Sequence, residues 1–79
     1  MSHNVEEERA MNLLAGTTGL SLERAANVYA GTTGLSLERA LNVANSSTGL
    51  SATKAANELA GTTGLELRGA LNALVDALP

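Results

Sequence analysis

Asparagine is the chemically active residue type with the most regular spacing in this chain. It recurs every fifteen residues, at Asn12, Asn27, Asn42, Asn57 and Asn72. An asparagine amide both donates and accepts hydrogen bonds, yet asparagine is a poor residue for a helix interior. Two interpretations stay open. Each amide ties down the backbone of an adjacent turn as a structural ladder, or the series forms a polar face that grips a partner.

The series lies on the polar side of its helices. At 100° per residue, Asn27 falls on the side of its helix opposite the apolar stripe, where Glu23 and Arg24 flank it. We favour the structural ladder, and if the series instead grips a partner, the five asparagines are the candidate partner-binding residues. The apolar residues Leu74, Val75 and Leu78 near the C-terminus are the other candidates, because an apolar end either caps the last repeat or anchors a partner.

The Gly-Thr-Thr-Gly sequences invite comparison with loops that cradle phosphate. They begin at Gly16, Gly31 and Gly61, and a Ser-Ser-Thr-Gly variant begins at Ser46. The sequence lacks the lysine of a P-loop and follows an expected helix instead of a strand. We interpret it as a turn that ends a helix, with anion binding at the next helix N-terminus as the alternative.

Few residues could support catalysis or bind a metal. His3 stands alone near the N-terminus, and the chain has no cysteine, so we expect no metal site and no nucleophile relay. Glu6, Glu7 and Glu8 suit the first turn of a helix, where carboxylates interact well with the helix dipole. A chain of 79 residues is also too small to form a deep cleft. We expect no enzymatic activity and no cofactor.

The elements that position these residues follow from the fifteen-residue period. Ser21 is suited to cap a helix N-terminus, and Gly31 is suited to end that helix in the left-handed conformation. Between them, one helical face carries Leu22, Ala25, Ala26 and Tyr29. Helices this short are unstable alone in water, so the repeats must pack on one another.

The sequence therefore predicts an all-α fold: a compact array of five short helices joined by Gly-Thr-Thr-Gly turns, either a miniature α-solenoid or a bundle. Residues 1–4 are expected to form a flexible arm and residues 5–79 a single domain, with the first helix beginning at about Val5. In the third turn, where Ser46 replaces glycine, we expect the helix end to shift back to Asn45, which tolerates the left-handed conformation.

Charge and hydropathy exclude two classes of partner. The net charge is −3, and the five basic residues are spread one per repeat, unlike the basic face of a nucleic-acid-binding protein. No apolar run approaches the roughly 20 residues of a membrane span. We expect neither nucleic acid nor membrane as a partner.

The repeated phrase Ala-Gly-Thr-Thr-Gly-Leu, followed by Ala-Leu-Asn, resembles tandem repeats in structural proteins of tailed bacteriophages that infect actinobacteria. The resemblance covers residues 9 to about 75. It implies a virion structural protein, assembled in the host cytoplasm, that decorates the capsid in many copies and binds the major capsid protein, another virion protein or itself. The third repeat departs from the pattern at Asn45–Ser46 and at 52–54.

Two other functions remain as alternatives. One is a tail or head–tail component present in few copies. The other is a free helical-repeat module that binds a peptide or a glycan through the asparagine face. Sugar binding would favour an aromatic platform, and Tyr29 is the single aromatic residue.

Overall fold

The computed structural model describes residues 3–79. The prediction of an all-α fold with five short helices is confirmed, because the described residues form five helices and no strand. They are α1 (Glu7–Ala15), α2 (Leu22–Ala30), α3 (Leu37–Asn45), α4 (Ala52–Ala60) and α5 (Leu67–Asp76). None of these helices is long and apolar enough to cross a membrane.

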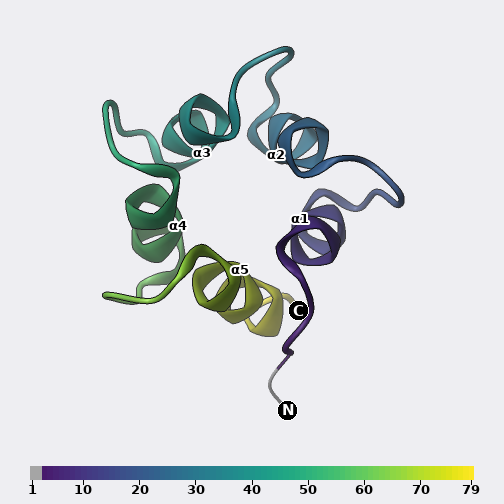
Figure 1. The fold of residues 1–79 in the computed structure, drawn as a ribbon, viewed down its shortest axis with the longest axis vertical. Helices are drawn as coiled ribbons and strands as arrows, with labels where there is room; N and C mark the ends of the chain where they lie inside the picture. The colour runs from purple at the N-terminus through teal and green to yellow at the C-terminus, as the bar shows by residue number, and fades with distance from the viewer. Residues whose placement is uncertain (1–2) are drawn as a thin grey trace.

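The five helices form a closed ring (Figure 1). Each helix packs against the next one along the chain, and α1 packs against α5. The connections run along the outside of the ring. Five helices cannot alternate in direction around a closed ring, and the connections share one geometry, so we infer that all five point the same way. The closure distinguishes this array from an open solenoid.

Capping residues delimit the helices as the sequence predicted. Ser21, Ser36 and Ser51 each accept a hydrogen bond from a backbone N–H in the first turn. Gly31 ends α2 with φ of 74°, in the left-handed region that glycine tolerates best.

The prediction for the third turn is wrong. The α3 helix ends without a shift, and Ser46 itself takes the left-handed conformation with φ of 57°. The backbone N–H of Ser46 bonds to the carbonyls of Asn42 and Val43. These bonds hold the turn in the register of the other repeats, and Asn45 stays helical, with its amide bonded to Ser47 and Glu58.

The N-terminal boundary also differs from the expectation. The first helix begins at Glu7, two residues after Val5. The sequence assigned residues 1–4 to a flexible arm. Residues 1 and 2 lie outside the described part, whereas His3 and Asn4 are hydrogen-bonded to α5. Val5 lies against α5, where the Asn72 side chain binds both its backbone N–H and its carbonyl oxygen.

The core lies inside the ring and is built from repeat-equivalent positions. One position is alanine in every helix and fully buried: Ala10, Ala25, Ala40, Ala55 and Ala70. The next position alternates in size around most of the ring: Met11, Ala26, Leu41, Ala56 and Leu71, all fully buried. The alanines bring the helices close together, and the larger side chains fill the interior, as interdigitated cores require.

Candidate functional site

The asparagine amides are buried between each helix and the segment that precedes the next one. Asn27 shows the arrangement. Its Nδ2 donates to the carbonyl oxygens of Glu23 and Leu35, both at 2.8 Å. Its Oδ1 accepts from Thr32 Oγ1 at 2.8 Å and from the backbone N–H of Leu35 at 3.1 Å. These four bonds use the whole capacity of the amide.

The other repeats copy this arrangement. Asn12, Asn42 and Asn57 make the same four bonds, with Ser47 in place of a threonine beside Asn42. The five asparagines are only 5–6% exposed. The alternative of an exposed polar face is wrong, because the turn folds back over that side of the helix. The contacts are those of the ladder interpretation.

The three apolar candidates near the C-terminus differ in their exposure. Val75 is buried at 5% exposure, and Leu74 is partly buried against the core. Leu78 lies beyond the end of α5 and is 45% exposed. The cap interpretation therefore describes Leu74 and Val75, whereas Leu78 remains accessible. The structure does not bring the eight predicted site residues together, since the asparagines are distributed around the whole ring.

The accessible repeated feature is a groove that we call the wall groove, between the outer side of a helix and the turn that follows it. At α2 its volume is about 230 Å³, and Arg24, Val28 and Thr33 are among its lining residues. Grooves of about 330 Å³ and 520 Å³ occupy the same place at α1 and α4. Each contains the residue that follows the buried asparagine.

Sequence reasoning missed the apolar component of the wall groove. Leu13, Val28 and Val43 directly follow an asparagine, and each is between 43% and 49% exposed. The sequence does contain a signal for it. An aliphatic residue recurs at the fifteen-residue period, on the side of the helix away from the apolar stripe. The polar asparagine beside each of these residues masks that signal in the sequence.

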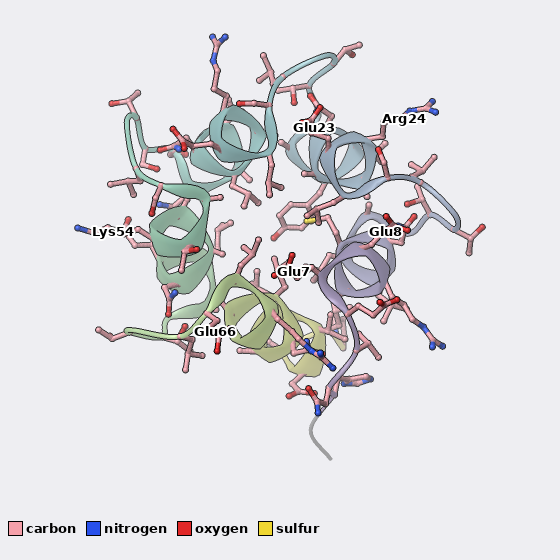
Figure 2. All side chains as sticks on the ribbon, in the orientation of Figure 1. Glu7, Glu8, Glu23, Arg24, Lys54 and Glu66 are labelled. Carbon is pink, nitrogen blue, oxygen red and sulfur yellow. The ribbon has the colours of Figure 1, made fainter. Side chains whose placement is uncertain are left out.

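Cations accompany these aliphatic side chains. Arg9, Arg24 and Lys54 line the grooves of α1, α2 and α4, and the equivalent Arg39 of α3 is exposed. Arg24 and Lys54 point outward from the ring (Figure 2). The one ion pair among residues 3–79 is His3–Asp76, so these four cations have no carboxylate partner in that part of the chain.

The groove at α5 is built differently. Arg68 and Gly69 stand where other repeats have the pairs Glu-Arg or Thr-Lys, and the N-terminal residues His3 and Asn4 line the groove. His3 Nδ1 lies 2.6 Å from Asp76 Oδ1, and the His3 backbone N–H donates to the same oxygen at 2.7 Å. These hydrogen bonds, the side-chain one first, lower the pKa of Asp76 from its ordinary value of 3.8.

The described residues offer no candidate metal site beside the wall grooves. The described residues contain no group of three or more His, Cys, Asp or Glu side chains that could hold a metal ion. No protein-family model, curated protein or solved structure matches the chain.

Proposed function

We propose that this chain is a structural protein that docks through its wall grooves on a repetitive protein surface, and that the surface is the shell of a bacteriophage particle. The observation that carries the proposal is an exposed aliphatic residue four positions after a cation that has no carboxylate partner among residues 3–79. It occurs at Arg9–Leu13, Arg24–Val28 and Arg39–Val43. The phage shell as the docking surface rests on the sequence resemblance.

The ring presents this pairing on successive helices. Each contact is small, but several engaged at once multiply the apparent affinity when their spacing matches that of the partner. The partner surface that fits is acidic and apolar, because it must balance a cation and cover an aliphatic side chain. Tyr29 packs against the core, which disfavours the glycan-binding alternative.

The first experiment measures the copy number of the chain in purified phage particles by quantitative mass spectrometry. A copy number of the same order as that of the major shell protein would support capsid decoration. A few copies per particle would favour a tail or head–tail component. Absence from particles would contradict the virion proposal.

Charged substitutions in the wall groove test the docking surface itself. In α4, Glu58 already occupies the position of Val28 and Val43, so the ring tolerates glutamate there. The double variant Val28→Glu, Val43→Glu should remain helical and lose at least tenfold in affinity for purified particles, because it buries carboxylates against an acidic surface. Glu58→Gln is the matched control: it changes the charge at the same repeat position in α4, where no aliphatic residue stands, and it should not weaken binding. Unchanged binding by the double variant would rule out these grooves.

A further inference from the structure

The joint between α5 and α1 repeats three of the four asparagine hydrogen bonds of the other joints but has no covalent connection. Asn72 Oδ1 accepts from the backbone N–H of Val5 at 2.9 Å, and Asn72 Nδ2 donates to the carbonyl oxygen of Val5 at 2.8 Å. Val5 precedes α1 by two residues, as Leu20 precedes α2. The N-terminal segment therefore replaces the segment that a fifth turn would supply.

Residues 3–5 are held at this joint mainly through their main chain. Arg68 Nη2 donates to the carbonyl oxygen of Asn4 at 2.9 Å. The backbone N–H of His3 donates to Asp76 Oδ1 at 2.7 Å, in addition to the two Val5 bonds. These contacts form a site for a short segment of main chain. Such a site cannot distinguish the N-terminal segment of its own chain from that of another copy.

We propose that α5 also binds the N-terminal segment and α1 of a second copy of this chain. Two copies that exchange these segments form a dimer. The connection at residues 16–21 would act as the hinge, because it lies outside the ring (Figure 1) and Gly16 and Gly19 hold its present bend at positive φ. Outside the hinge, the exchanged dimer repeats the contacts of the closed ring, as domain swapping requires.

Concentration decides between the two forms. A short flexible connection holds α1 near its own α5 at an effective concentration of roughly millimolar, so dilute chains close on themselves. When the chain itself reaches a similar concentration, two copies exchange their α1 helices and form the dimer. This inference is independent of the proposed virion role, since it requires only copies of this chain.

Cysteine pairing detects the exchange directly, because the chain has no cysteine of its own. Two full-length single variants, His3→Cys and Asp76→Cys, are refolded together from denaturant, one of them carrying a mass tag. At roughly millimolar total concentration, the mixed disulfide should exceed the amount expected from random pairing by at least fivefold. At a hundredfold lower concentration the excess should disappear. Random proportions at high concentration would overturn the proposal.

A second pair of variants shows that the backbone site is responsible. Val5→Pro, added to the His3→Cys chain, removes the N–H that donates to Asn72 and should reduce the mixed disulfide severalfold. Val5→Ala keeps that N–H and is the matched control. Circular dichroism establishes that both variants fold. Equal yields from the two folded variants would show that exchange does not use this site and would also overturn the proposal.

Discussion

At the residue scale, the buried asparagine supplies hydrogen bonds to polar groups of the connection that have no partner within the connection itself. Its four hydrogen bonds satisfy the hydroxyl of the turn and both backbone groups of the leucine before the next helix. The poor helix propensity of asparagine costs well under 1 kcal/mol. An unsatisfied buried polar group costs about 1–3 kcal/mol, so the side chain is favourable overall.

Replacing Asn42 by alanine should therefore destabilise the ring. The change leaves the backbone N–H and carbonyl of Leu50 without their side-chain partner, and we expect a loss of about 2–3 kcal/mol in the free energy of unfolding. Urea denaturation followed by circular dichroism measures it. The neighbouring Val43→Ala, at an exposed position, should change stability by less than about 0.5 kcal/mol. Equal effects of the two changes would contradict the ladder.

At the element scale, each helix is nine or ten residues long and depends on its ends. Ser21, Ser36 and Ser51 cap three N-termini, whereas Glu6 and Glu66 provide no side-chain cap. At the C-termini, glycine accommodates the left-handed conformation in three helices, and α3 ends in serine instead. The end of α3 is therefore the strained one.

Ser46→Gly should relieve this strain and stabilise the protein. A non-glycine residue in the left-handed region costs roughly 1–2 kcal/mol, and the greater unfolded-state entropy of glycine offsets part of the gain, so we expect about 0.5–1 kcal/mol. The reverse change at the matched position, Gly31→Ser, should lose a similar amount. Chemical denaturation of both variants tests this, and a loss for Ser46→Gly would show that the serine side chain stabilises the turn.

At the scale of the whole molecule, ring closure depends on the contact between the two ends of the chain. The His3–Asp76 interaction lies at that contact and lowers the pKa of Asp76. A carboxyl whose folded-state pKa is depressed stabilises the folded state above its ordinary pKa, and that contribution is lost as the pH falls through the lowered value.

Asp76→Asn should consequently be less stable than the unaltered chain near neutral pH. The difference should shrink towards zero as the pH falls below 3.8, because the protonated carboxyl then resembles the amide. Unfolding free energies of the two proteins across this range provide the test. The other carboxyl groups are common to both proteins and cancel in the difference. A difference that stays constant with pH would exclude the ionised carboxylate as its source.

A covalent fifth connection should stabilise the ring most. Replacing residues 76–79 by Gly-Thr-Thr-Gly and joining them to Val5 keeps Asn72 and Asn12 fifteen residues apart. Backbone cyclisation of this sequence restricts the unfolded chain and should add up to about 4 kcal/mol of stability. The matched control is the same sequence opened between Ala30 and Gly31. If the two forms unfold at the same denaturant concentration, the open joint is not the weak point of the fold.

The sequence by itself determined the units of this protein. The period, the serine caps, the glycine ends and the alanine-rich stripe are local or repeating patterns, and they predicted five short helices and their approximate bounds. Local rules suffice here because caps and turns are decided by hydrogen bonds within a few residues. The same period also places Val5 in register with Leu20, a signal that predicts which residue meets Asn72 once closure is known.

Only the tertiary structure decided whether the array closes and which side of each helix stays accessible. Closure of five repeats requires each to be rotated from the last by a fifth of a full turn. Side-chain packing sets that rotation, and no single residue encodes it. Asn27 and Val28 are adjacent in the sequence, yet the turn covers the first and leaves the second half exposed. Helical periodicity locates a residue on its own helix. It does not show which side of that helix the next segment covers. That packing decides that the asparagines are buried and that the residues of the wall groove stay accessible.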